Sequence, residues 1–278
     1  MNFKWTELQL KRLSELNVPE DKKDVTFLSE EERNAVFKKF EKIFVKENRA
    51  ELNILKNETK RPVLCRLTSK LIQALINNDF VQVATPTILS KGLLQKMSID
   101  DEHELYSQVF WLDDKKCLRP MLAPNLYYIS KDLLRIWEKP VRIFEVGSCF
   151  RKESQGSHHL NEFTMLNLVE WGVPMDKRQQ RIEEMASIIM NVVGIEGYSL
   201  EKTSSVVYGD TIDIMYGDTE IASCSMGPHF LDENWGITDS WIGIGFGLER
   251  ILMITENSPN VSRMGRSLTY LNGIRLNI

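Results

Sequence analysis

The stretch 141-VRIFEVGSCFRKESQGSHHLNEFTMLNLV-169 decides the fold of this chain. It predicts two apolar strands, Val141–Phe150 and Glu162–Val169, joined by a polar loop that contains Gly156. The joint between the strands carries charged and imidazole side chains: Arg151, Glu153, His158 and His159. An arginine fork can hold phosphate oxygens, and a carboxylate can accept from an exocyclic amine. We therefore expect this hairpin to bind a purine nucleotide through its phosphates, with Phe163 lying on the base.

Outward from the hairpin, residues 62–278 indicate one continuous domain. Helices are expected at about 67–76, 125–137, 176–193 and 248–256, and further strands at 80–85, 198–201, 211–216 and 220–226. Most of the expected strands form hairpins or follow one another directly in the sequence, without regular strand–helix–strand alternation. This pattern predicts an α+β domain with a mostly antiparallel sheet flanked by helices, not a doubly wound parallel sheet.

Residues 1–61 predict a small helical N-terminal extension. Thr6 is a suitable N-cap for a first helix, and Ser29 with Glu32 forms a capping box for a second. From Arg33 to Arg61, nine Lys or Arg residues stand against four Glu. This excess fits either a solvated helix face or a contact with a phosphate backbone. After Glu256 the tail holds no acid, so its three basic residues are a second candidate for such a contact: Arg263, Arg266 and Arg275.

Composition restricts the class of protein. Of the 278 residues 42% are hydrophobic and 27% are charged, which is ordinary for a globular chain, and the formal net charge is -4. Binding to an anionic polymer must therefore come from local patches. No apolar run reaches the length of a membrane span, so we expect no membrane partner. The four cysteines are isolated, which predicts free thiols in a reducing cytoplasm and no zinc site.

Near the C-terminus, 243-GIGFGLER-250 passes from a glycine-rich strand into a helix. The GxGxG spacing differs from the GxGxxG of dinucleotide-binding loops, and no strand–helix–strand unit follows it. Either the glycines let another layer pack closely, or they clear a floor for a flat ligand. In the second case Arg250 would stack on a base or meet a phosphate.

These segments together resemble the class II aminoacyl-tRNA synthetases. Phe150–Glu153 followed by His159 and Phe163 matches the second motif of that family, and Gly243–Arg250 matches the third. The helix before Phe80 and the strand ending at Pro86 match the first motif, which forms the dimer interface in the family. The resemblance implies a class II synthetase-like sheet, ATP and Mg²⁺ as cofactors, a homodimer, and ligation of an amino acid to tRNA.

The resemblance also implies residue roles in ATP binding. Arg151 would hold the α-phosphate and the substrate carboxylate, and Arg250 would lie over adenine or reach a phosphate; these two are the expected catalytic residues. The other expected ATP ligands are Glu153 on the adenine amine, Phe163 on the ring and His159 on the γ-phosphate. Mg²⁺ would be held by Glu220 and Ser223. His158 does not fall at the position that the family motif gives to its histidine, so we interpret it as a loop residue.

Several further segments are similar to the pyrrolysyl-tRNA synthetase family. They are 118-LRPMLAPNLY-127, 143-IFEVGSCFRKES-154, 159-HLNEFTMLNL-168, 207-VYGDTIDIMYGD-218 and 241-WIGIGFGLER-250. The resemblance covers residues 62–278 and implies pyrrolysine, or a similar Nε-acyl-lysine, as the amino acid and tRNA-Pyl as the partner. Many members carry a separate N-terminal tRNA-binding domain, for which residues 1–60 are too short. We therefore expect a stand-alone form whose extension contacts the tRNA.

A long acylated lysine requires a deep apolar pocket with one polar group at the depth of its amide. Asn167 fits that requirement because its amide can donate and accept. Tyr208, in a glycine-flanked loop, would close the pocket as a lid. The expected walls and floor are Ala123, Leu126, Tyr127, Met165, Val169, Trp241 and Gly243.

One residue departs from the family pattern. Ser130 lies one helical turn after Leu126, where members place a larger apolar residue, so we expect a wider or more polar pocket there, or compensation by Ile129. Two other functions stay open from the sequence. One is a class II relative that charges another amino acid, of the phenylalanyl or phosphoseryl type. The other is a synthetase-like paralogue that binds nucleotide or tRNA without charging.

Overall fold

The computed structural model describes residues 3–152 and 160–278, which fall into two compact units. The first unit comprises Met1–Val63 with Arg266–Ile278, and the second comprises Leu64–Gly265. The expected boundary after residue 61 lies close to the observed one. The tail differs: we expected residues 266–278 in the larger domain, but they belong to the N-terminal unit.

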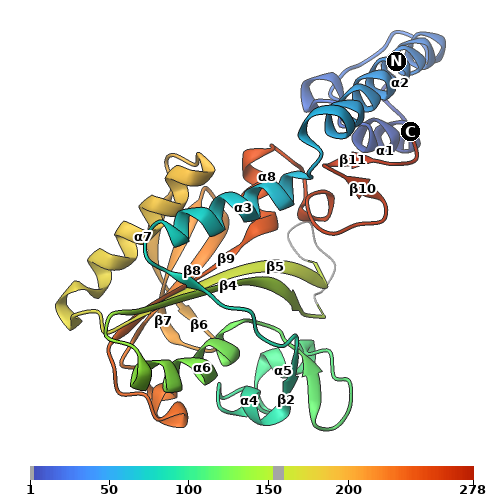
Figure 1. Ribbon diagram of the computed structural model, residues 1–278. Helices are drawn as coiled ribbons and strands as arrows, with labels where there is room; N and C mark the ends of the chain where they lie inside the picture. The colour runs from blue at the N-terminus through green and yellow to red at the C-terminus, as the bar shows by residue number, and fades with distance from the viewer. Residues whose placement is uncertain (1–2, 153–159) are drawn as a thin grey trace. The chain divides into compact units, whose positions relative to one another are not determined.

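A seven-stranded sheet forms the centre of the second unit (Figure 1). Its order is β1-β4-β5-β9-β8-β7-β6, and every neighbouring pair is antiparallel except β1 with β4. The strands are β1 (Val81–Gln82), β4 (Val141–Phe150), β5 (Glu162–Trp171), β6 (Ser199–Ser205), β7 (Gly209–Tyr216), β8 (Thr219–Gly227) and β9 (Trp241–Gly247). The predicted α+β class and the mostly antiparallel sheet are thus confirmed.

The predicted hairpin forms β4 and β5, the second and third strands from the β1 edge of this sheet. Strand β4 has the predicted bounds, and β5 runs two residues further than predicted, to Trp171. The predicted strand at 80–85 shortens to β1, because the Thr85 N–H and hydroxyl donate to the Glu145 carboxylate (3.1 and 2.6 Å).

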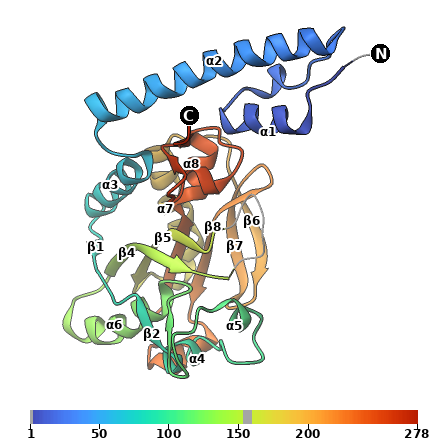
Figure 2. The same cartoon turned by 90° about the vertical axis from the view of Figure 1, so that its right-hand side faces the viewer.

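Helices cover both faces of the sheet. In Figures 1 and 2, α3 and α7 lie on one face, and α6 lies on the other. The helices of this unit are α3 (Val63–Ile76), α4 (Lys91–Gln95), α5 (Glu104–Gln108), α6 (Ala123–Ile136), α7 (Arg178–Val193) and α8 (Leu248–Thr255). Short 3₁₀ helices are η3 (Met175–Lys177), η4 (Phe230–Trp235) and η5 (Val261–Arg263), and a small antiparallel pair joins β2 (Ile88–Ser90) to β3 (Lys116–Leu118).

The apolar core on the α6 face combines residues far apart in the sequence. It contains Tyr127 of α6, Trp171 of β5, Trp235 of η4 and Trp241 of β9. Tyr127 stacks on Trp235 with ring centroids 5.4 Å apart and meets both other indoles edge-on. This aromatic group fixes α6 against the sheet, because large buried rings contribute much of the apolar area of a core.

The first unit is a small helical body. It contains α1 (Glu7–Glu15), η1 (Glu20–Lys22), α2 (Glu30–Ile54), the π-helical turn η2 (Leu55–Thr59) and the pair β10 (Tyr270–Leu271) with β11 (Ile274–Arg275). Trp5, Phe27 and Phe44 are part of its core. Thr6 forms the predicted N-cap of α1, with a capping box to Gln9.

The tail is bound to this first unit by side chains. Arg275 forms an ion pair with Glu15, and Asn17 donates to the Gly273 carbonyl (3.2 Å). Arg263 is buried at 6% exposure. Burial makes Arg263 a poor candidate for the phosphate contact considered for the tail, while the partly exposed Arg275 stays a candidate.

No disulfide joins the four cysteines, all of which lie in the described part of the chain. Cys117, Cys149 and Cys224 are buried and Cys65 is exposed. Across residues 3–152 and 160–278, no helix has both the length and the apolar character that crossing a bilayer requires.

Candidate active site

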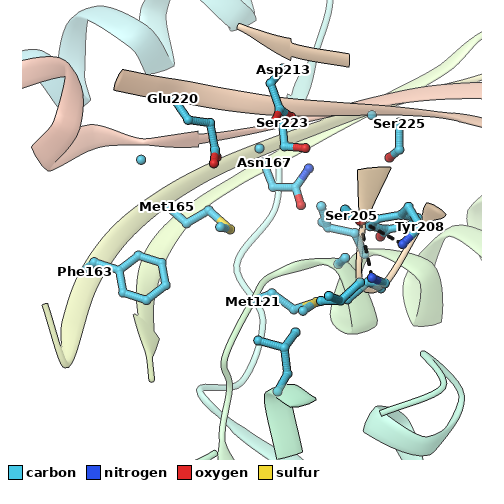
Figure 3. A pocket seen from close by; sticks show the side chains of 18 of the residues that line it. Met121, Phe163, Met165, Asn167, Ser205, Tyr208, Asp213, Glu220, Ser223 and Ser225 are labelled. Atoms are coloured by element: carbon cyan, nitrogen blue, oxygen red, sulfur yellow. Dashed lines mark hydrogen bonds between the residues drawn. The ribbon is translucent and has the colours of Figure 1, made fainter. Parts of the chain in front are cut away.

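A cavity of about 440 Å³ opens on the α6 face of the sheet (Figure 3). Its walls come from β5, β7, β8 and β9, from the start of α6, and from the loop between β6 and β7. Residues that the chain separates by more than 100 positions meet here, for example Ala123 and Arg250. The sheet supplies a rigid floor for whatever the cavity binds.

The register of the sheet explains which side chains reach the cavity. Asn167 of β5 is paired with Gly245 of β9, Gly245 with Ser223 of β8, and Ser223 with Asp213 of β7. Directly paired residues of antiparallel strands point to the same face. This row therefore presents an amide, an open glycine, a hydroxyl and a carboxylate side by side.

All the predicted pocket residues line this one cavity: Ala123, Leu126, Tyr127, Met165, Asn167, Val169, Tyr208, Trp241 and Gly243. Five predicted nucleotide ligands line it as well: Arg151, Phe163, Glu220, Ser223 and Arg250. Glu153 and His159 lie outside the described residues, as does His158. The two arginines, 99 residues apart in the chain, thus face a common cavity.

Arg151 is fixed directly after β4 by three contacts. Its Nε donates to the Pro120 carbonyl (2.9 Å), and its guanidinium lies over the Phe163 ring, 5.4 Å from the centroid. The Arg151 N–H donates to the Asn161 carbonyl (3.1 Å), which holds the residue to the start of the next strand. These contacts leave the guanidinium at the cavity wall in a defined orientation.

Arg250 is held against β8. Its Nη1 lies 3.2 Å from the Glu220 Oε1 and donates to the Glu220 carbonyl at 3.2 Å. We expected Arg250 to contact a base or a phosphate and Glu220 to hold a metal. In the structure the two side chains form an ion pair with one another. Both side chains are partly exposed, at 28% and 44%, so the pair is open to exchange with a ligand.

The glycine-rich strand β9 was expected either to let another layer pack closely or to clear space for a flat ligand, and the space around its glycines distinguishes the two. A Cβ added at Gly245 would meet no atom within 4 Å, whereas one at Gly243 would lie 3.2 Å from the Trp241 ring. Gly245 therefore borders open space and does not serve close packing of another layer. Asn167 lies beside it on the neighbouring strand β5, and its Nδ2 donates to the Leu168 and Ile244 carbonyls (both 3.1 Å), which orients the amide.

Asp232 of η4 fixes two of the cavity walls. Its Oδ1 accepts from the Tyr127 hydroxyl and its Oδ2 from the Trp241 indole N–H, both at 2.9 Å. Burial raises the pKa of the Tyr127 hydroxyl, and the neighbouring Tyr208 and Asp232 raise it further. Tyr127 therefore stays protonated and keeps donating to this carboxylate.

Ser130 does not line the cavity, contrary to the expectation of a wider or more polar pocket at this residue. It is fully buried, and its Oγ accepts from the Trp171 Nε1 at 2.9 Å. Trp171 itself lines the cavity. The small hydroxyl residue thus replaces apolar contact by a hydrogen bond that positions a wall indole.

Asp213 of β7 also lines the cavity and was not among the predicted site residues. Its Oδ1 is buried, and no hydrogen-bond partner is found for it within the described residues. Burial raises the pKa of the Asp213 carboxyl, with a smaller contribution from Glu220 in the same direction, while the Ser223 hydroxyl and Arg250 lower it. In the sequence Asp213 is one of many polar residues that alternate with apolar ones along a strand, so nothing marks it as a site residue. Only the pairing of β7 with β8 places it beside Ser223.

The oxygen atoms of Glu220, Ser223 and Asp213 suit a hard cation. Mg²⁺ takes oxygen ligands, keeps several waters and commonly uses one or two carboxylates. In the described ranges, no group of three or more His, Cys, Asp or Glu side chains is placed to hold a metal alone. The buried Asp213 Oδ1, for which the described residues offer no hydrogen-bond partner, lies near the oxygen atoms of Glu220 and Ser223 and fits such a shared site.

Comparison with known proteins places this geometry in context. The family model described as "tRNA synthetases class II core domain (F)" matches residues 51–273. The chain is similar to the crystal structure of pyrrolysyl-tRNA synthetase from Desulfitobacterium hafniense, with a TM-score of 0.94, 53% identity and 99% coverage of each chain. A second structure from that organism, PylSc, gives a TM-score of 0.91 and 52% identity, with 99% of this chain and 96% of the other covered.

More distant likeness extends to other tRNA ligases. A threonine–tRNA ligase from Wolbachia sp. subsp. Drosophila simulans is 27% identical over 164 residues, which are 56% of this chain and 25% of that protein. One from Wolbachia sp. subsp. Brugia malayi is 34% identical over 98 residues. The matched part of the chain spans about a quarter or less of the length of these curated relatives.

Proposed function

This chain belongs to the class II tRNA synthetases, and from that membership we propose that it is an aminoacyl-tRNA ligase for pyrrolysine or a similar Nε-acyl-lysine. It activates the amino acid with ATP to an aminoacyl-adenylate and transfers the acyl group to its cognate tRNA, tRNA-Pyl. The observation that carries the proposal is the shared cavity. Arg151 and Arg250 line it together with apolar walls and the amide of Asn167.

Activation is the attack of the substrate carboxylate on the α-phosphorus of ATP. It needs no protein nucleophile, because positioning the two anions and offsetting their charge supply most of the catalysis. Arg151 binds the α-phosphate and the carboxylate, and its hydrogen bond to Pro120 keeps the guanidinium ready. Phe163, already under that guanidinium, lies against adenine.

The remaining ATP contacts follow the family pattern. Glu153 accepts from the adenine amine and His159 meets the γ-phosphate; in the sequence both fall between β4 and β5. Arg250 lies over the adenine or reaches a phosphate, and it exchanges its ion pair with Glu220 for that contact. The fixed strand ends on either side of the loop favour this arrangement, because they hold Arg151 and Phe163 in place.

Magnesium is the expected metal. Glu220 and Ser223 would hold it, and Asp213 lies beside Ser223 on β7, with one carboxylate oxygen for which no hydrogen-bond partner is found in the described part of the chain. When bound, the ion offsets negative charge on the polyphosphate. The protein's own part is to present these oxygens from two paired strands, so that their spacing does not depend on a loop.

The other end of the cavity binds the side chain of the amino acid. Apolar side chains of α6, β5 and β9 accommodate a long methylene chain, and Asn167 meets the amide on its ε-nitrogen. Tyr208 closes the pocket over the ring. A phosphoserine would require further cationic groups, but within residues 3–152 and 160–278 the arginines of the cavity are Arg151 and Arg250 alone.

The larger assembly is part of the same proposal. The extension at 1–61 contacts tRNA through the basic face of α2, by which we mean the exposed Lys38, Lys39 and Lys42. Residues 62–278 carry the chemistry, in the cytoplasm. The chain forms a homodimer through α3 and the sheet edge β1, where Ile76 and Val81 are each 46% exposed. Exposed apolar residues at a sheet edge favour pairing with a second copy.

The direct test is ATP–pyrophosphate exchange with a panel of amino acids that includes lysine, phenylalanine, phosphoserine, threonine and Nε-acyl-lysines. We expect exchange with the Nε-acyl-lysines above the other members, followed by charging of tRNA-Pyl. Exchange that is strongest with phenylalanine or phosphoserine would favour the alternative relatives. Nucleotide binding without exchange for any amino acid would favour a non-charging paralogue.

A further inference from the structure

The loop that joins β6 to β7 is bound to the rest of the unit by two histidines. We call residues 205–209 the lid loop. Ser205, Val206, Val207 and Tyr208 line the cavity, so the position of this loop sets the closure of the pocket. Inside the loop, the Ser205 Oγ accepts from the Val207 and Tyr208 N–H groups (3.3 and 2.9 Å; dashed in Figure 3). The loop is therefore stiff locally, and its attachment depends on outside contacts.

His103 makes the first outside contact. It is the N-cap of α5, and its Nδ1 accepts from the Leu105 N–H at 3.1 Å. A ring nitrogen that accepts carries no proton, so the proton of the neutral ring lies on Nε2. That Nε2 is 3.0 Å from the Val206 carbonyl and donates to it.

His229 repeats the arrangement on the other side of the lid loop. It is the N-cap of η4, and its Nδ1 accepts from the Leu231 N–H at 3.3 Å. Its Nε2 therefore carries the proton and donates to the Tyr208 carbonyl at 2.7 Å. The rings of His229 and Tyr208 also meet edge-on, with centroids 5.6 Å apart.

We propose that His103 and His229 are positioning residues that clasp the lid loop over the amino-acid pocket, each by donating from Nε2 to a lid carbonyl. This inference rests on the proposed function, since it takes the lid to cover the bound amino acid. Both residues act through Tyr208 and its neighbours and neither touches the reacting atoms.

A capping role alone does not account for these two residues. Capping uses only the acceptor, and Asn, Asp, Ser and Thr supply that acceptor more commonly. What histidine adds is a second nitrogen on the far side of the ring. In both positions that second nitrogen meets a carbonyl of the same short loop, two residues apart.

The clasp also couples the lid to the walls of the pocket. Helix α5 carries Leu105, which lines the cavity directly after His103 and Glu104. The η4 turn carries Asp232, which accepts from the His229 N–H at 2.7 Å and holds Tyr127 and Trp241. A substrate that displaces Tyr127 or Trp241 would therefore also shift the lid loop, through Asp232 and His229.

The two functions of each ring can be separated by substitution. Asparagine offers an Oδ1 near the position of Nδ1, so His103→Asn and His229→Asn keep the cap and remove the donor to the lid. Glutamine reaches further, so His103→Gln and His229→Gln keep the donor near the position of Nε2 and weaken the cap. Each Gln variant is thus the matched control for its Asn partner.

In pyrophosphate exchange, each Asn variant should raise KM for the Nε-acyl-lysine about two- to tenfold, the effect of losing one typical hydrogen bond. The double Asn variant should show about the product of the two effects. The KM for ATP and kcat should change less than twofold, and the Gln variants should lie close to wild type. An Asn variant with unchanged amino-acid KM, or with kcat and both KM values altered together, would overturn the clasp.

Hydrogen exchange of the ligand-free protein separates failure of the clasp from failure of the proposed function. The peptide covering residues 203–210 should exchange faster in the Asn variants than in the wild-type and Gln proteins, whichever amino acid is the substrate. Equal exchange in the Asn variants and the wild type would refute the clasp even if charging is observed. Faster exchange in a protein that activates no amino acid would instead refute the function and leave the clasp.

Discussion

At Ser130 a single hydroxyl is fully buried among apolar side chains. Because it is the hydrogen-bond partner of the buried Trp171 indole, Ser130→Ala should leave that N–H unsatisfied and lower the free energy of unfolding by about 1–3 kcal/mol. Urea denaturation measures this. Ser199→Ala, at an exposed strand start, is the control and should change stability little. Equal effects of the two substitutions would contradict the role given to Ser130.

Asn167 carries the polar part of specificity in the proposed function. Its amide is fixed by two main-chain carbonyls, so Asn167→Ala removes an oriented polar group from an apolar pocket. We expect the Nε-acyl-lysine to lose about 1–3 kcal/mol in kcat/KM, measured by pyrophosphate exchange. KM for ATP should change little. A variant that keeps wild-type kcat/KM on this substrate would show that Asn167 does not read the amide.

At the scale of elements, a buried ion pair joins the segment after β3 to the centre of the sheet. Arg119 lies 2.7 Å from Glu145 of β4, both about 4% exposed, and its Nε donates to the Ser148 carbonyl (2.8 Å). A Cβ at Gly147 would clash with this guanidinium, so the glycine makes room for it. The next residue, Pro120, accepts from Arg151, so this pair underlies the position of Arg151 at the cavity wall.

Removing one member of that pair should be costly, because it leaves an uncompensated buried charge. Arg119→Met should destabilise by about 3–5 kcal/mol in urea denaturation, and adding Glu145→Leu should restore most of the loss. The matched control is Arg135→Met, whose partner Asp132 is 59% exposed and 4.0 Å away, and it should have little effect. A double variant as unstable as Arg119→Met would speak against charge burial as the cause.

At the scale of the whole molecule, the basic face of α2 and the cavity belong to different units. Phe37, Phe40 and Phe44 of α2 belong to the core of the first unit or pack against it. Lys38, Lys39 and Lys42 are exposed on the same helix, so they are available to phosphates. This division should let tRNA binding and adenylate formation be altered independently.

Replacing the three lysines by alanine should weaken tRNA binding and reduce its salt dependence by about two to three in the slope of log K against log salt. Pyrophosphate exchange should stay at the wild-type rate. As a control, Glu47→Gln with Glu51→Gln removes exposed charges of opposite sign from the same helix and should not weaken binding. Equal loss of tRNA binding and exchange in the lysine variant would contradict this division.

The sequence alone predicted the β4–β5 hairpin and the α+β class, because strand alternation and turn residues are local signals. The resemblance of short segments to a known family predicted the residues that line the cavity. Only the tertiary structure decided which strands are neighbours and in what register. That register aligns Asp213 with Ser223 and Gly245, pairs Arg250 with Glu220, and brings His103 and His229 to one loop. These contacts join residues from 10 to more than 100 positions apart, and local sequence patterns do not encode pairing over such separations.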